Sequence, residues 1–180
     1  MMKSDKAILD TSVLICLYQL NLLENLFLFF NKVRVPRKVE EEFLQRNPDE
    51  LERSQRYSYI ENFYQKNTTW FIRCVEYSDD LISIYTADKK IDLGEAEVFA
   101  QNQALGNDHI MLLDETNARS LAKSNELSCH GVLFILAKLD LNFKACDYFT
   151  NVNLLRNKFH FRLNDKIVNS VYESVAKSNH

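Results

Sequence analysis

The sequence contains little glycine and proline, with three and two residues respectively in a chain of 180. This scarcity argues against long flexible loops, so we expect helix to dominate. It also lacks a long apolar run, because polar residues interrupt its most apolar stretch, residues 14–30, and a membrane-spanning helix needs about 20 mostly apolar residues. The first residues do not have the apolar core of a signal peptide. We therefore expect a cytoplasmic protein without a membrane span.

Metal-binding and disulfide patterns are absent as well. The four cysteines contain no C-x-x-C pair, and the four histidines contain no H-x-x-x-H pair, which argues against a zinc site and favours free buried thiols in a reducing compartment. The net charge of −3 provides no overall attraction to nucleic acid. Any binding of a polyanion must therefore come from a local group of cations.

The composition is that of a globular protein, with 46% hydrophobic and 26% charged residues. A chain of this length fits one domain that can bury its own core. We interpret residues 1–142 as the main domain and residues 143–180 as a helical C-terminal extension packed on it. Apolar residues recur at helical spacing from residue 143, and residues 165–177 are expected to form a final helix.

Short apolar segments alternate with helical patterns along the main domain. Strands are expected at residues 7–9, 33–36, 70–75, 109–113 and 127–130, and the intervening helices include residues 13–20, 22–30, 37–45, 49–65, 79–87, 96–105 and 117–124. Thr11 or Ser12 is the expected cap of the first helix, and Asn47 and Ser78 are expected to cap later ones. This alternation predicts an α/β fold with a parallel sheet and helices on both faces.

Two of the predicted strands end at an aspartate. Asp10 follows the first strand and Asp114 follows the strand at residues 109–113. Ligands of such folds bind beyond the carboxyl ends of the strands, so both side chains should face the same crevice. Either aspartate alone could be a turn or cap residue, but the pair together indicates a site.

Two glutamates can join this acidic pair. Glu42 lies near the start of a helix that follows a strand, although it could instead belong to a solvated helix face, which is what we expect of Glu40 and Glu41. Glu95 could instead complete a capping box with Asp92. Close carboxylates repel one another, and a cation relieves that repulsion. Oxygen ligands without nearby histidine or cysteine favour Mg²⁺ or Mn²⁺.

Four sequence segments resemble motifs of the PIN-domain family, in the branch that contains VapC-type toxins. They are Ile8-Leu9-Asp10-Thr11-Ser12, Val35-Pro36 through Val39-Glu40-Glu41-Glu42, Leu93-Gly94-Glu95-Ala96-Glu97, and Leu112-Leu113-Asp114-Glu115 with Ala118-Arg119. They occur in the family's order over residues 6–140. The resemblance implies a three-layer fold with about five parallel strands, and a metal-dependent ribonuclease that uses Mg²⁺ or Mn²⁺.

The resemblance also implies roles for particular residues. Asp10, Asp114 and Glu95 would be metal ligands, and Glu42, favoured over Glu41 by its register, would complete the catalytic acidic set. Glu95 stands where many family members have aspartate. The supporting polar residues would be Ser12 and either Glu115 or Asn117. A cognate antitoxin and a homodimer are further possibilities that the family implies.

Cations flank these motifs and are the predicted RNA-binding residues. They are Arg37, Lys38, Arg119 and Lys123, with Arg34, Lys89 and Lys90 as further candidates. Three alternatives remain open: a catalytically inactive PIN-fold module that binds RNA or protein, a phosphatase with an aspartate nucleophile, and a structural partner that docks through residues 49–65. The phosphatase is disfavoured because Ser12 stands where a second aspartate is expected.

Overall fold

The computed structural model describes residues 5–46, 49–74, 79–87 and 91–178. They form a three-layer α/β fold around a five-stranded sheet of order β3-β2-β1-β4-β5, and every neighbouring pair of strands is parallel. The predicted fold class is therefore confirmed. The strands are β1 (Asp5–Leu9), β2 (Phe30–Val35), β3 (Phe71–Arg73), β4 (Ile110–Leu112) and β5 (Cys129–His130).

Strand β1 lies at the centre of the sheet because its residues suit full burial. Ala7, Ile8 and Leu9 are completely buried, and they pair with β2 on one side and β4 on the other. A strand covered on both faces needs a continuous apolar run rather than an alternating one. Residues that follow β1 and β4 therefore emerge next to each other at one edge of the sheet.

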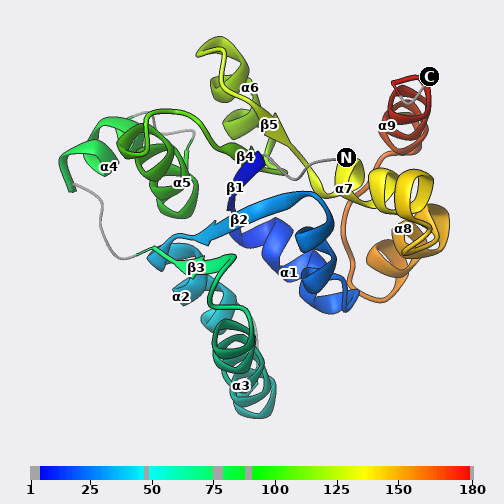
Figure 1. Ribbon diagram of the computed structural model, residues 1–180, viewed down its shortest axis with the longest axis horizontal. Helices are drawn as coiled ribbons and strands as arrows, with labels where there is room; N and C mark the ends of the chain where they lie inside the picture. Colours follow the sequence, from blue (N-terminus) through cyan, green and yellow to red (C-terminus); the bar gives the residue numbers. More distant parts are fainter. Residues whose placement is uncertain (1–4, 47–48, 75–78, 88–90, 179–180) are drawn as a thin grey trace.

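Helices cover both faces of this sheet. Figure 1 shows α1, α2 and α3 on one face and α4, α5 and α6 on the other, while α7, α8 and α9 gather at one side of the molecule. Their bounds are α1 (Thr11–Gln19), α2 (Arg37–Gln45), α3 (Glu50–Lys66), α4 (Asp79–Thr86), α5 (Leu93–Ala104), α6 (Thr116–Ser124), α7 (Val132–Lys138), α8 (Tyr148–Asn157) and α9 (Asp165–Lys177).

Two local predictions are wrong. The segment predicted as a helix at residues 22–30 is a short 3-10 helix, η1 (Leu23–Leu28), after which Phe30 already begins β2. The cap of α1 is Asp10 and not Thr11 or Ser12, because the Asp10 side chain accepts a hydrogen bond from Val13 N. The predicted caps Asn47 and Ser78 lie outside the described residues, as does Val75 of the third predicted strand; Asp49 caps α3.

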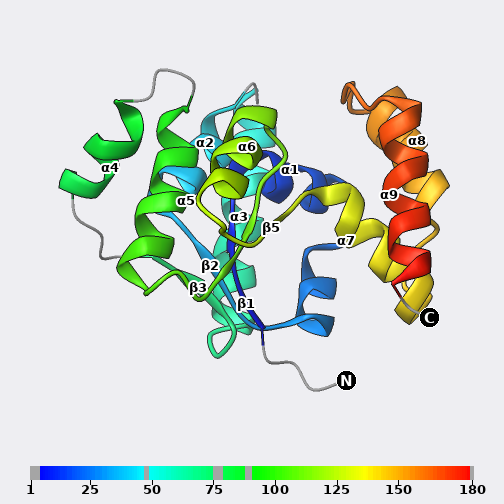
Figure 2. The same cartoon turned by 90° about the horizontal axis from the view of Figure 1, so that it is seen from above.

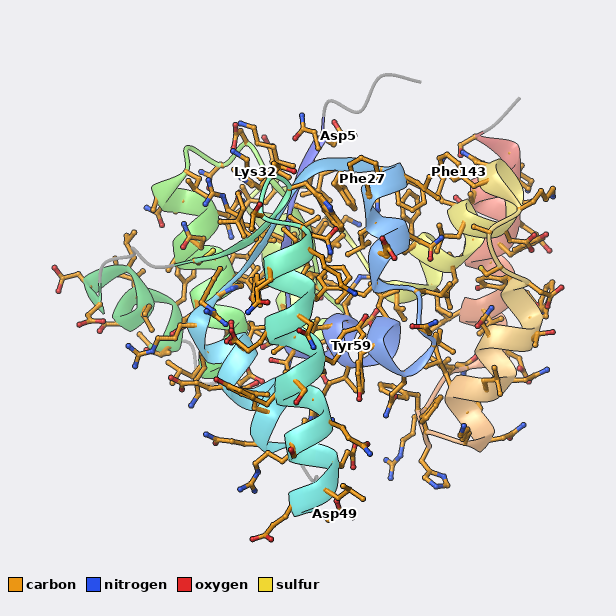
Figure 3. All side chains as sticks on the ribbon, turned by 60° about the horizontal axis from the view of Figure 1, so that its bottom comes forward. Asp5, Phe27, Lys32, Asp49, Tyr59 and Phe143 are labelled. Carbon is orange, nitrogen blue, oxygen red and sulfur yellow. The ribbon has the colours of Figure 1, made fainter. Side chains whose placement is uncertain are left out.

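Helix α3 is long and polar, and it packs mainly through aromatic residues. Tyr59 points from α3 toward α1 (Figure 3), where its ring centroid lies 4.8 Å from that of Tyr18. Arg56 is buried beside them and donates hydrogen bonds to Phe43 O at 2.8 Å and Glu52 Oε1. Figure 3 also shows Asp49, at the start of α3, and Asp5, at the start of β1, at opposite ends of the molecule.

The C-terminal helices pack on α7, which continues into the π-helical turn η2 (Leu139–Phe143). Buried Tyr148 of α8 donates a hydrogen bond to Val168 O of α9 at 2.8 Å, and both residues belong to the same hydrophobic core as the sheet. The boundary at residue 142 stays a prediction. None of the helices within the described ranges is long and apolar enough to cross a membrane.

Candidate metal centre

Asp10 and Asp114 lie side by side beyond the carboxyl ends of the two central strands. Leu9 of β1 pairs with Leu112 of β4, and Asp10 N donates to Leu112 O at 3.1 Å. Two residues after β4, Asp114 N donates to Asp10 Oδ2 at 3.3 Å. The backbone of one acidic residue thus holds the side chain of the other, in the shared crevice that the two strand ends predicted.

The carboxylate of Asp10 is held by the first turn of α1. Its Oδ1 accepts hydrogen bonds from Val13 N and from Ser12 Oγ, both at 2.8 Å, and Ser12 Oγ also lies 3.0 Å from Oδ2. Asp10 is 3% exposed. One side chain therefore caps a helix and presents a negative charge at the crevice, and Ser12 is the hydroxyl that orients it.

Asp114 is oriented from the opposite side by the start of α7. Its Oδ1 accepts a hydrogen bond from Val132 N at 2.9 Å. The preceding residue is Gly131, and a Cβ atom built there would lie only 2.4 Å from Asp114 Oδ1. The carboxylate therefore occupies space that only glycine leaves open. This close approach explains why α7 begins directly after a glycine.

Glu95 belongs to the predicted capping box at the start of α5. Asp92 Oδ1 accepts from Glu95 N at 2.8 Å, and Glu95 Oε2 accepts from Asp92 N at 3.1 Å. The capping role is confirmed. Its second oxygen, Oε1, is buried without a hydrogen-bond partner in the part of the chain that the structure describes. A buried oxygen in this condition is costly, and a cation would satisfy it.

Glu42 lies between the first turns of α1 and α5. Its Oε2 accepts a hydrogen bond from Thr11 Oγ1 at 2.7 Å, and a Cβ at Gly94 would lie 3.0 Å from the same oxygen. Its neighbour Glu41 points elsewhere and pairs with Arg37 and Lys38, at 3.0 and 3.5 Å. The structure therefore places Glu42, and not Glu41, beside the helices that carry Asp10 and Glu95.

Three of the four acids share an unfavourable electrostatic environment. Loss of solvation raises the pKa of Asp10 to about 6, although hydrogen bonds from Val13 and Ser12 oppose the shift. Loss of solvation and then the charge of Asp10 raise the pKa of Asp114 to about 7. Glu95 also reaches a pKa of about 7, first through burial and with smaller contributions from Asp92, Asp10 and Glu115.

The donor chemistry of these residues fits a divalent cation. Carboxylate oxygens are the ligands that Mg²⁺ and Mn²⁺ prefer, and the raised pKa values and the spare oxygen of Glu95 are features that a bound cation would relieve. Within the described ranges, no group of three or more His, Cys, Asp or Glu side chains is already close enough together to hold one ion. Asp10, Asp114 and Glu95 would therefore have to move closer together to hold a single ion.

A family model described as a PIN domain matches residues 6–177. The chain belongs to the PIN-domain family. No curated protein sequence matches the chain. PIN domains are in general nucleases, and they typically use divalent metal ions, which agrees with the acidic centre at the ends of β1 and β4. The family match runs beyond residue 140 through α8 and α9.

Glu115 and Asn117, the two candidate supporting residues of this PIN domain, lie in different places. Glu115 lines a cleft of about 1320 Å³ together with Ser12 and Asp114. Asn117 is exposed on α6 and does not line that cleft. Of the two residues between which the sequence could not decide, Glu115 is therefore the one beside the acidic pair.

Of the predicted RNA-binding cations, some line this cleft and others do not. Arg119 of α6 lines the cleft with Asp114, and its charge acts to lower the pKa of that carboxyl. Arg37 and Lys38 pair with Glu41, and Lys123 is exposed on α6 away from the cleft lining. Lys89 and Lys90 lie outside the described residues.

Sequence reasoning missed two residues that position the acidic helices. Thr11, treated only as a possible cap, donates its hydroxyl hydrogen bond to Glu42. Glu97 is 6% exposed, and its Oε2 accepts a hydrogen bond from Lys38 N at 2.6 Å, so it links α5 to the first turn of α2. A glutamate between apolar Ala96 and Val98 in a buried helix was the available signal.

Proposed function

We propose that the protein is a Mg²⁺- or Mn²⁺-dependent endoribonuclease that hydrolyses phosphodiester bonds at the Asp10–Asp114 centre. The observation that carries the proposal is the contact between these two acids, whose Asp114 N to Asp10 Oδ2 distance is 3.3 Å. Both carboxyls are poorly solvated and have raised pKa values, in spite of the hydrogen bonds that orient them. Their proximity is unfavourable unless a cation binds there.

Each acidic residue has a definite part in this proposal. Asp10 and Asp114 hold the ion, and their orientation comes from hydrogen bonds with Ser12, Val13 and Val132. Glu95 contributes its unpartnered oxygen. A bound divalent cation supplies positive charge to the phosphate oxygens in the transition state and acidifies the attacking water.

Glu42 contributes to the charge and hydrogen bonding around the centre without being assigned as a metal ligand. Thr11 fixes one of its oxygens at 2.7 Å. In a site of this kind, a carboxylate beside the ligands can accept a proton from water as that water attacks the phosphorus. No covalent intermediate between enzyme and substrate is required.

The test is cleavage of a mixed set of labelled single-stranded and hairpin RNAs with Mn²⁺, with Mg²⁺ and with chelator. The Asp10→Asn variant is the comparison, because asparagine still caps a helix and so preserves the start of α1. Cleavage that requires metal and is lost in the variant supports the proposal. Failure of the folded wild type to cleave any RNA, at any metal concentration, contradicts it.

A catalytically inactive RNA- or protein-binding module is the second candidate. Two observations favour it: Glu95 is already engaged in its capping box, and no three acids of the described chain converge on one point. A glutamate at this position is also longer than aspartate. RNA binding by both wild type and Asp10→Asn, with cleavage by neither, is the outcome that selects this alternative.

The toxin of a toxin–antitoxin pair is the biological role that the resemblance to VapC-type PIN domains suggests. It implies growth arrest when the protein is expressed alone, and relief of the arrest by a protein encoded beside it. Homodimer formation is part of the same proposal. Exposed Leu51 and Tyr57, at 69% and 56%, provide apolar contact surface on α3. Sedimentation of the purified chain decides whether it forms dimers.

A further inference from the structure

The segment between α8 and α9 alternates cationic and apolar residues. Its sequence from residue 158 is Lys-Phe-His-Phe-Arg-Leu. Lys158, His160 and Arg162 are exposed, whereas Phe159 and Phe161 are half-buried and pack against the core. The backbone is right-handed helical at Lys158 and left-handed at His160, so the alternation arises from a turn and not from a regular strand. The loop therefore presents its polar side chains outward on an apolar base.

This loop is tied down at both ends. Phe161 N donates to Leu155 O at 2.9 Å, and Arg156 donates to Leu163 O at 3.0 and 2.7 Å while pairing with Asp165 at 2.7 Å. These contacts fix the path of the backbone from α8 to α9. A loop held in this way presents its side chains with little loss of conformational entropy on binding.

The loop forms one wall of the cleft that Asp114 of the acidic centre also lines. Ser12, Asp114 and Glu115 line the same cleft as residues 158–164. In Figure 2 the loop that leads into α9 rises on the same side of the molecule as α6 and the start of α1. An extended ligand in the cleft can therefore contact the loop and Asp114 at the same time.

Most of the cations that line this cleft have no salt bridge, and Arg56, which pairs with Glu52, is the exception among its described lysines and arginines. Arg37, Lys38, Arg73 and Arg156 are all engaged with carboxylates. Among the residues that the structure places, four cations line the cleft with no carboxylate within 4.0 Å, and these are Arg46, Arg119, Lys158 and Arg162. Their charges are available to an anionic ligand.

His160 stands at the middle of the loop in a rare backbone conformation. Its φ of 60° lies in the left-handed region, which residues other than glycine seldom occupy. The exposed imidazole ring lines the cleft, and a flat ring in this position can stack on a nucleobase.

We infer that residues 158–163 form a substrate-binding wall, along which single-stranded RNA runs on one side of the bond cut at the acidic centre. Lys158 and Arg162 contact phosphates from one wall of the cleft and Arg119 from the other, while His160 stacks on a base. The assignment of RNA as the occupant rests on the proposed function. Binding through phosphates needs no metal, so the wall can be tested separately from cleavage.

The experiment measures the fluorescence anisotropy of a labelled single-stranded RNA of mixed sequence, in chelator, over a range of salt concentrations. The test protein carries Lys158→Ala with Arg162→Ala. The matched control carries Lys166→Ala with Lys177→Ala, which removes the same charge from α9 at positions that do not line the cleft. The melting temperature of both variants is recorded, and a DNA of the same sequence is run in parallel.

The expected result is RNA binding by wild type and control, and binding about tenfold weaker or worse in the test variant. Loss of two phosphate contacts should also reduce the slope of log affinity against log salt by about 1.4. A His160→Ala variant should lose affinity without a change in that slope, because stacking carries no charge. Tighter binding of the DNA than of the RNA would overturn RNA as the occupant.

Cleavage of the same RNA in Mn²⁺ separates this inference from the proposed function. Weakened binding in the test variant, with no cleavage by the wild type, supports the wall and contradicts the nuclease. Cleavage by the wild type, with equal RNA binding by test variant and control, overturns the wall and leaves the nuclease standing. Absence of both binding and cleavage overturns both.

Discussion

The backbone N–H of Asp114 donates a hydrogen bond to Oδ2 of Asp10, 104 positions earlier in the chain, at 3.3 Å. This bond joins the ends of the two central strands across the site. It also makes the two carboxyls electrostatically dependent, since the charge of Asp10 contributes to the raised pKa of Asp114. Any substitution that moves one of these carboxyls should therefore change the position and the pKa of the other.

Gly131→Ala is expected to impair both stability and cleavage. The new Cβ would lie 2.4 Å from Asp114 Oδ1, and this short side chain cannot move away without losing its hydrogen bond from Val132 N. We expect a loss of about 1–3 kcal/mol in the free energy of unfolding, as for other overpacked positions. Urea unfolding measures the stability, and the RNA assay measures the activity.

Gly94→Ala is the matched comparison, since it adds the same methyl group beside a longer acid. Its Cβ would lie 3.0 Å from Glu42 Oε2, the end of a longer side chain that can move slightly while it keeps the hydrogen bond from Thr11. Alanine also favours the helix by up to about 1 kcal/mol. Stability should change by less than about 1 kcal/mol, while cleavage falls. Equal destabilisation by both substitutions would contradict the tight packing assigned to Asp114.

Thr11→Val should disturb Glu42 without removing any acid. The substitution keeps the shape of the side chain but deletes the hydroxyl that donates to Glu42 Oε2 at 2.7 Å. A hydrogen bond to a charged group contributes about 1.5–3 kcal/mol, and we expect a loss of stability within that range and slower cleavage. Thr11→Ser retains the hydroxyl and should behave as wild type. Similar losses in both variants would assign the effect to packing instead.

Some residues of the acidic site could be predicted from the sequence, whereas other contacts became visible only in the structure. Asp10 and Asp114 were predictable, because each follows a short apolar run and parallel strands end at one edge of the sheet. The capping box of Asp92 and Glu95 was predictable because it depends on residues three positions apart. The contacts of Thr11 with Glu42 and of Glu97 with Lys38 join residues 31 and 59 positions apart, and no local pattern encodes them.

The error at η1 and the position of the loop before α9 both depend on contacts between segments far apart in the sequence. The apolar residues of segment 22–30 have helical spacing. Because Phe30 pairs with Asp5 and belongs to β2, only a short 3-10 helix forms before it. The alternation from Lys158 to Leu163 was visible in the sequence, yet only the packing of α8 and α9 against α7 brings it to the cleft.

The stability of the metal-free protein should depend on pH through the acidic pair. The folded state raises the pKa of Asp114 from 3.8 to about 7, so it binds a proton more tightly than the unfolded chain. The contribution of Asp114 to the free energy of unfolding therefore decreases as pH rises from about 4 to about 7, and it stays at its lower value above that. Asp114→Asn removes this dependence.

The measurement is the melting temperature of wild type and Asp114→Asn between pH 4 and pH 8, in chelator. The variant minus wild-type difference should increase by at least about 2 °C over this range, the shift that roughly 1 kcal/mol produces in a domain of this size. Comparing the two proteins cancels the opposing contribution of His109 and His130, whose pKa values burial lowers. A constant or decreasing difference would show that Asp114 is well solvated.

The central claim is that Asp10, Glu95 and Asp114 bind a divalent metal ion. The most direct test is a titration with Mn²⁺ at pH 7.5, in which electron paramagnetic resonance measures the concentration of free Mn²⁺. It compares wild type with Asp10→Asn, Asp114→Asn and Glu95→Gln, and with Glu41→Gln as the control acid that pairs with Arg37. We predict that wild type and control bind Mn²⁺ alike and that each of the three other variants binds it at least about tenfold more weakly. Equal Mn²⁺ affinity in all five proteins would contradict a metal centre at Asp10, Glu95 and Asp114.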